Sequence, residues 1–270
     1  MASDLKKFNA TLAMPNTQEY LKNVLASKAK PFVANLTSLV ANNQALQECE
    51  PVTLMYAGIK ATALDLPLDA NLGFAYVIPF KNSKKGVTEA EFMLGYKAFI
   101  QLALRSGQFE TINVRDVREG EIVGEDFVSG EMQFRQLDAN VRMNAPIIGY
   151  VGFFRLINGF HKMLYMSKEE VEAHAKRYSQ TYASKTDWVK SQSKWTTDFD
   201  AMARKTIIKQ LLSKYAPMSV EMQQAVQFDQ SVARTENLEN DYVDNEPKDT
   251  EEVMAEEIQN NAQSQTLNFE

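Results

Sequence analysis

Apolar residues crowd together between Leu94 and Phe109, in the run LGYKAFIQLALRSGQF. Nearly every residue from Ala98 to Leu104 is apolar, which predicts a helix buried on most sides. Lys97, Gln101 and Arg105 recur every fourth residue and form one polar stripe along that helix. A cation beside a packed core needs an anion to offset its desolvation, and this helix contains no acid. The pattern therefore predicts that the anion lies elsewhere.

The segments before this helix predict a second helix and a hairpin. Pro51–Leu66 has proline at a plausible first helical position and small residues that allow close packing. In Gly73–Lys81 (GFAYVIPFK) the large apolar residues alternate with smaller ones in the period of a strand. The turn NSKKG and a second strand, Ala90–Tyr96, follow. The predicted order is helix, hairpin with a basic tip, helix.

These residues resemble the RecT family of single-strand DNA annealing proteins, the phage recombinases. The resemblance rests on TLMYAGIKATALDLPLDANLGFAYVIPFK, then LGYKAFIQLALRSGQF, then a strand carrying Arg115 and Arg118, and it extends from Pro51 to Tyr215. It implies a protein that coats single-stranded DNA, assembles with copies of itself into rings or helical filaments, and pairs complementary strands into duplex. It also implies a phage or prophage protein in the bacterial cytoplasm, whose C-terminal part contacts an exonuclease or the host single-strand-binding protein.

The rest of the chain predicts more helices and a second hairpin. Residues 17–48 carry apolar stripes typical of two or three short helices. Two extended runs, Ile147–Ile157 and Phe160–Met166, flank Asn158-Gly159, which favours a type I′ turn. Ser167 and Glu170 then form a capping box for a helix. Antiparallel hairpins with segregated helices predict an α+β fold, in which a small sheet packs with helices behind a helical N-terminal region.

Charge divides the chain unevenly, although the formal net charge is only −6. Met218–Glu270 holds 13 acids and 2 basic residues, so the first 217 residues carry a balance of +5. We therefore expect three regions: a helical region at 1–50 available for subunit contacts, a DNA-binding annealing core at 51–217, and an acidic tail at 218–270. Apart from a short helix around Val220–Phe228, low hydrophobicity and clustered acids predict that the tail is disordered.

Basic and aromatic residues alternate between Lys176 and Lys214, which suits single-stranded nucleic acid. Cations neutralise phosphates, while ring faces accept any base without reading its sequence. The helix predicted at Thr197–Tyr215 carries Lys205 and Lys209 one turn apart. The residues expected near the DNA backbone are Lys81, Lys97, Arg105, Arg115, Arg155, Lys205 and Lys209, with Tyr76 and Tyr96 as candidate stacking residues.

Two other functions stay open on the sequence alone. The first is a metal-dependent nuclease, because convergent carboxylates can hold Mg²⁺; the acids in question are Asp116, Glu119, Glu121, Glu125 and Asp126. A solvated loop explains this cluster better, and we expect no catalytic residue. The second is a coating protein that binds single strands and blocks annealing.

Cofactor chemistry finds little support in the sequence. The chain lacks the phosphate loop G-x-x-x-x-G-K-[ST], so we expect no ATP, and Mg²⁺ would only modulate DNA binding. His161 and His174 lack the spacing of a metal site, so we interpret both as structural. A single cysteine, Cys49, suits a reducing compartment, and no apolar stretch approaches a membrane span. We expect a cytoplasmic protein.

Overall fold

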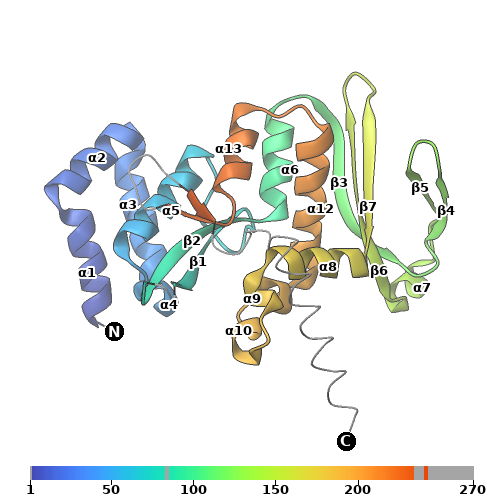
Figure 1. Cartoon of the computed structure of the whole chain (residues 1–270). Coiled ribbons are helices and arrows are strands. Elements are labelled where there is room, and N and C mark those ends of the chain that lie inside the picture. The colour runs from blue at the N-terminus through green and yellow to red at the C-terminus, as the bar shows by residue number, and fades with distance from the viewer. Residues whose placement is uncertain (1, 83–84, 234–239, 243–270) are drawn as a thin grey trace, which may run out of the picture.

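The computed structural model describes residues 2–82, 85–233 and 240–242 (Figure 1). Its α-helices are α1 (Ala2–Ala13), α2 (Pro15–Leu25), α3 (Ala29–Ala41), α4 (Gln44–Gln47), α5 (Pro51–Ala63), α6 (Tyr96–Arg105), α7 (Ala139–Asn144), α8 (Lys168–Tyr178), α9 (Gln180–Ala183), α10 (Asp187–Ser191), α11 (Lys194–Thr197), α12 (Phe199–Tyr215) and α13 (Val220–Phe228), with one 3-10 turn at Ala26–Lys28. Its strands are β1 (Ala75–Asn82), β2 (Val87–Leu94), β3 (Phe109–Arg118), β4 (Ile122–Asp126), β5 (Glu131–Phe134), β6 (Ile147–Leu156), β7 (His161–Ser167), β8 (Ser231–Ala233) and β9 (Asn240–Tyr242). The predicted α+β class is confirmed.

The N-terminal helices gather at one end of the molecule (Figure 1). Their apolar stripes meet in a core that includes Leu25, Phe32, Leu36 and Val40. Helix α3 packs tightly on α5, because a Cβ at Gly58 would lie only 2.7 Å from the Phe32 ring. The small residues of α5 thus permit the close packing that the sequence predicts.

A first sheet has the strand order β1-β2-β8-β9 and is antiparallel. Strands β1 and β2 form the predicted hairpin, with Ala75 opposite Leu94 and Asn82 opposite Val87. Strand β8 extends this hairpin by pairing Ser231 with Phe92. Residues 220–233, which the sequence analysis places in the acidic tail, therefore form α13 and β8 and contribute buried residues to the core. The rest of that tail, at 234–239 and 243–270, lies outside the described residues.

A second antiparallel sheet, of order β3-β6-β7, carries α12 on one face, and the β4–β5 hairpin lies beyond its other side (Figure 1). Gly152 lets α12 approach, since a Cβ there would lie 2.8 Å from Ile207 Cγ2. The predicted type I′ turn between β6 and β7 is wrong. Gly159 has a φ of 87°, but Asn158 is not among the positive-φ residues of the described chain. The loop instead resembles a type I turn followed by a left-handed glycine.

Helix α6 forms where the sequence predicts it, but the prediction that it is buried on most sides is wrong. Only one face of α6 is buried. This face consists of Ala98, Phe99, Leu102 and Ala103, which pack toward α12 and its neighbours. Leu104 is half-exposed, and both cations of the predicted polar stripe reach solvent. Within the described part of the chain, no helix combines the length and apolar character needed to cross a membrane.

Candidate nucleic-acid interface

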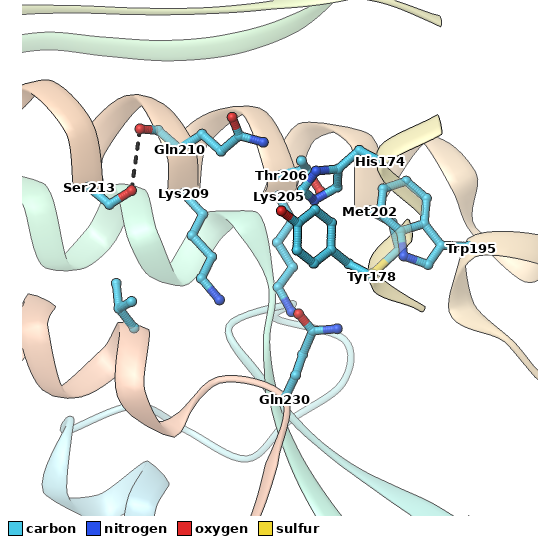
Figure 2. A pocket seen from close by; sticks show the side chains of 11 residues that line it. His174, Tyr178, Trp195, Met202, Lys205, Thr206, Lys209, Gln210, Ser213 and Gln230 are labelled. Carbon is cyan, nitrogen blue, oxygen red and sulfur yellow. Dashed lines mark hydrogen bonds between the residues drawn. The ribbon is translucent and has the colours of Figure 1, made fainter. Parts of the chain in front are cut away.

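A groove runs along α12 beside α8, and we call it the α8–α12 groove. Two cavities of about 400 and 520 Å³ open along it and share His174, Tyr178 and Gln210. The groove is defined by His174, Arg177, Tyr178, Lys209, Gln210 and Lys214. Figure 2 shows Lys205 and Lys209 extending from α12 toward Gln230, with His174 and Tyr178 beside them.

The groove is positively charged. Three cations, Arg177, Lys209 and Lys214, lie close enough to His174 to disfavour its protonation. Burial of the imidazole lowers its pKa first, these cations lower it further, and the pKa falls to about 4. His174 is therefore neutral at pH 7. The positive charges of these three side chains disfavour a protonated imidazole and attract a phosphate.

Helix α8 also supplies a stacked pair of rings. The imidazole of His174 and the phenol ring of Tyr178 have centroids 4.5 Å apart, as expected for residues four apart on one helix face. The guanidinium of Arg177 lies 5.5 Å from the centroid of the Tyr178 ring. Arg177 and Lys214 are exposed, and both rings are partly exposed. A cation beside a partly exposed aromatic pair is the combination that accepts a phosphate and a base face.

A buried carboxylate fixes the floor of the groove. One oxygen of Asp229 lies 2.7 Å from Lys205 Nζ and the other lies 2.8 Å from Lys209 Nζ. Burial alone would raise the pKa of Asp229, but the two ammonium groups hold it below its usual value. Burial lowers the pKa of Lys205, while Asp229 and Glu91 act to raise it, so a second carboxylate lies close to the two lysines. Lys209 is partly exposed and borders the groove, whereas Lys205 is almost fully buried.

Comparison with known proteins decides the family. The model of the RecT family matches residues 30–250 of this chain. The chain belongs to the RecT family. Among its relatives is the Escherichia coli (strain K12) protein named "Protein RecT", which is 30% identical over 226 residues, or 80% of this chain and 77% of that protein. Another relative is the Bacillus subtilis (strain 168) protein named "Uncharacterized protein YqaK", 36% identical over 247 residues, or 90% of this chain and 80% of that protein. RecT membership supports DNA binding and single-strand annealing in recombination as the general activity.

The structure brings only some of the predicted DNA-binding residues of this RecT protein to the groove. Lys209 lies there, and Lys205 lies beneath it with its ammonium on Asp229. Because Lys205 is almost fully buried, its side chain binds Asp229 and does not reach a strand in the groove. The sequence indicated a spacing of one turn between these lysines, but it could not show which of them faces the core.

Tyr76, Tyr96 and Lys97 form a second group, where β1 and α6 meet. The carbonyl oxygen of Gly73 lies so close to Gly95 that a Cβ at Gly95 would collide with it, and the Tyr76 ring lies against the same glycine. Lys97 Nζ donates to the carbonyl of Leu72 at 3.4 Å. Burial raises the pKa of Tyr76, and Asp198, the residue that precedes α12, and Tyr96 raise it further. Tyr76 and Tyr96 are partly exposed, and Lys97 is exposed.

The other predicted residues lie apart from both groups. Arg115 and Arg155 are exposed on β3 and β6, and Arg155 lies 3.7 Å from Glu110. Lys81 is exposed near the end of the β1–β2 hairpin. Arg105 donates hydrogen bonds of 2.8 Å to the carbonyls of Leu64 and Asp65, which follow α5. Arg105 also acts to lower the pKa of two acids outside α6, Asp65 and Glu221, so the prediction that its anion lies elsewhere in the chain is confirmed, whereas Lys97 contacts a backbone carbonyl instead.

Sequence reasoning missed part of the groove. His174 was interpreted as structural, and Arg177 and Lys214 were not singled out. A usable signal was present, since His174, Arg177 and Tyr178 follow one another at positions i, i+3 and i+4, which places them on one face of a helix. That spacing does not predict where α8 lies relative to α12, because strands β6 and β7 and the loop after α8 determine the position of α8.

Two members of the acidic cluster, Asp116 and Glu121, border a cavity of about 490 Å³ together with Arg115, Arg135 and Arg142, and both acids are paired with arginines. Asp116 is bound by Arg118, Arg142 and Arg204 at 2.8, 3.1 and 3.2 Å, and Glu121 by Arg142 at 2.7 Å. Burial acts to raise the pKa of Asp116, but Arg118, a backbone hydrogen bond and Arg142 lower it to about 2. Among the described residues, no group of three or more histidine, cysteine or acidic side chains could hold a metal ion. Asp116 and Glu121 therefore serve an ion-pair network.

Proposed function

We propose that this RecT protein binds single-stranded DNA in the α8–α12 groove and anneals complementary strands without ATP, as a ring or helical filament. The observation that carries the proposal is the gathering of Arg177, Lys209 and Lys214 around a neutral His174 in an open groove. Family membership supports the general activity. The groove supplies a place for the strand.

The proposed mechanism is electrostatic. Phosphates of the strand replace counterions along the groove, so affinity falls steeply as salt rises. Neutralised strands repel one another less, and the energy of annealing comes from base pairing itself. The His174–Tyr178 pair offers a ring face to a base without selecting its identity. No group transfer occurs, so the proposal requires neither a catalytic residue nor a nucleotide, and a divalent cation would only modulate binding by screening phosphates.

The nuclease alternative finds no favourable observation. The two most buried acids of the cluster, Asp116 and Glu121, are already neutralised by arginines, and a metal ion would have to displace those partners. A coating protein that blocks annealing would use the same groove as an annealing protein. Family membership favours annealing, and the assay below distinguishes the two functions.

The proposed partners beyond DNA rest on the family resemblance. We propose that the acidic segment after Tyr242, which lies outside the described residues, recruits an exonuclease or the host single-strand-binding protein. Its surplus of acids would keep it apart from DNA and favour basic patches on proteins. On the same resemblance, we propose that the protein acts in the bacterial cytoplasm.

The test is annealing of two labelled complementary oligonucleotides without nucleotide, with and without divalent metal. We would compare the wild type with Arg177→Ala/Lys214→Ala and with a control of equal charge loss, Lys6→Ala/Lys185→Ala, whose side chains are exposed elsewhere. We expect the groove variant to lose at least tenfold in affinity and in annealing rate. Its salt slope should fall by about 1.4, for two lost contacts to a single strand.

Equal losses in the groove variant and the control would contradict the proposed groove. Strand degradation that requires divalent metal would favour the nuclease. Binding that protects the strands and slows their pairing would favour the coating protein.

A further inference from the structure

The described chain ends beside the α8–α12 groove. In the first sheet, Tyr242 of β9 lies opposite Ser231 of β8. Gln230, the residue before Ser231, lines one cavity of the groove together with Lys209 (Figure 2). Residues 243–270 therefore continue from a point next to the proposed DNA site.

The segment that follows Tyr242 is acidic. Residues 243–270 contain eight acids and one lysine. Five of these acids lie in DTEEVMAEEI, residues 249–258, which contains no lysine or arginine and which we call the acidic segment. Val253, Met254 and Ile258 give the same segment apolar side chains. It therefore combines negative charge with apolar surface.

The groove has the complementary charge. Arg177, Lys209 and Lys214 border it, and no acid is among the described residues that line its two cavities. Two buried carboxylates, Asp229 and Glu91, offset the charge of the lysines at its floor. Within the described part of the chain, neither Arg177 nor Lys214 forms an ion pair. These two cations are therefore available to a carboxylate from outside the described fold.

The groove also has apolar surface. Met166 and Val226 are partly exposed and Ala173 is exposed where they line it. The three apolar side chains of the acidic segment would bury this surface while its acids pair with the cations. Contacts between protein surfaces combine an apolar centre with a polar rim in this way.

The acidic segment is long enough to lie along the groove of its own chain. The seven residues from Tyr242 to Asp249 span at most about 25 Å when extended, at about 3.6 Å per residue. The groove follows α12 from Lys205 to Lys214, which is about 14 Å at about 1.5 Å per residue. Tethering gives the segment an effective concentration on the order of 1 mM at the groove, so a weak contact is sufficient.

We propose that the acidic segment occupies the α8–α12 groove of its own chain while no strand is bound there. Its acids neutralise Arg177, Lys209 and Lys214 until a DNA strand, which brings a longer row of negative charges, displaces them. This inference rests on the proposed DNA groove and describes its regulation. Because displacement frees the acidic segment, recruitment of a partner protein through that segment would follow DNA binding.

The first test maps the contact in the full chain. A carbodiimide joins lysine amines to carboxylates that touch them, and mass spectrometry identifies the joined residues. In DNA-free protein we expect Lys209 or Lys214 to be joined to the acidic segment, whereas exposed Lys6 on α1 is the control and should not be joined to it. These cross-links should disappear with a saturating single-stranded oligonucleotide. They should also disappear in about 1 M salt, where the screening length is about 3 Å.

The second test measures the regulation. The tail variant is Glu251→Gln/Glu252→Gln/Glu256→Gln/Glu257→Gln, and the control, Glu19→Gln/Glu48→Gln/Glu119→Gln/Glu125→Gln, removes the same charge from exposed acids elsewhere. At an effective concentration of about 1 mM, a contact with a Kd of about 0.5 mM would weaken DNA binding about threefold. We therefore expect the tail variant to bind an oligonucleotide about threefold more tightly than the wild type at about 50 mM salt, with the control within about 1.5-fold. Its salt slope should be steeper, because counterions instead of acids fill the groove before DNA binds.

Two results would overturn the inference. The acidic segment could be joined to the groove lysines no more often than to Lys6, or the tail variant and the control could change the affinity equally, which would leave the tail only its net charge.

A mixture of isotope-labelled and unlabelled protein identifies the occupant of the groove. Cross-links found only between differently labelled chains would assign the groove to the tail of a second copy and overturn the contact within one chain. Failure of the proposed DNA groove has another signature, since Arg177→Ala/Lys214→Ala would then keep the oligonucleotide affinity of the wild type. The two failures are therefore distinguishable.

Discussion

Asp229 Oδ1 lies 2.7 Å from the Nζ of Lys205, and both side chains are almost completely buried. Asp229 follows α13, whereas Lys205 belongs to the middle of α12, so this ion pair ties the C-terminal segment to the central helix. Asp229 also accepts a hydrogen bond from the backbone N–H of Leu94 at 3.0 Å. A residue in the part of the chain that resembles an acidic tail thus organises the floor of the proposed DNA groove.

Asp229→Asn should strongly destabilise the fold. The substitution keeps the shape of the side chain but leaves two ammonium groups without their counter-charge, one of them fully buried. Breaking a buried pair by removing one partner costs about 3–5 kcal/mol. Urea denaturation should show this loss in the free energy of unfolding. Glu19→Gln is the control, since Glu19 is exposed on α2, and it should change stability by less than about 0.5 kcal/mol. Equal stability of the two variants would contradict the role of Asp229.

Asp116 should contribute a stability that depends on acid pH. Its pKa is about 2 in the folded protein against 3.8 for the unperturbed group, so the folded state favours the carboxylate. The contribution is fully present above about pH 4 and is lost as pH falls through about 2. We expect about 1–2 kcal/mol, measured as the difference between wild type and Asp116→Asn in denaturation at pH 6 and at the lowest pH where both remain folded. A pH-independent difference would contradict the ion-pair network.

His174 should report DNA in the groove. Its pKa is about 4 in the free protein because burial and three cations disfavour the imidazolium. A phosphate beside these cations would offset their field and raise this pKa, while the lowering by burial remains. Binding would then take up a proton and become tighter as pH falls toward 4. An NMR titration of the His174 ring with and without an oligonucleotide measures the shift, and exposed His161 is the control. An unchanged His174 pKa with DNA bound would place the strand elsewhere.

Arg105 should matter for stability more than for DNA binding. Its guanidinium donates to the carbonyls of Leu64 and Asp65, and Arg105→Gln would remove both this forked geometry and the charge. We expect thermal unfolding to show a loss of about 1 kcal/mol, while the salt slope of oligonucleotide binding stays unchanged. A reduced slope with wild-type stability would instead support the phosphate contact that the sequence suggested.

Gly95→Ala should disturb the group formed by Tyr76, Tyr96 and Lys97. An added Cβ would collide with the carbonyl of Gly73, so the start of α6 must move. We expect a loss of about 1–3 kcal/mol and weaker oligonucleotide binding. Gly124→Ala is the matched control, because a Cβ there meets nothing within 4 Å and its φ is not left-handed. Normal stability with weak oligonucleotide binding would show that the movement of α6 alters only the exposed group of Tyr76, Tyr96 and Lys97.

The sequence by itself determined the local elements and the family of this protein. The alternation in Gly73–Lys81 and the capping box at Ser167 appear in the structure as β1 and the start of α8, because such patterns depend on residues near one another in the chain. The turn at Asn158-Gly159 was predicted as the wrong type, since two turn types share a glycine with positive φ.

The tertiary structure alone decided which cations are buried and which are free. Lys97 and Arg105 reach solvent, whereas Lys60 and Lys205, which composition does not distinguish from other lysines, lie in the interior. Burial depends on which elements pack together, and a pair such as Asp229 and Lys205 forms only when α13 docks on α6 and β2, β8 pairs with β2, and α12 packs on α6. The same packing places His174 of α8 beside Lys209 of α12, which is why the proposed groove was not visible in the sequence.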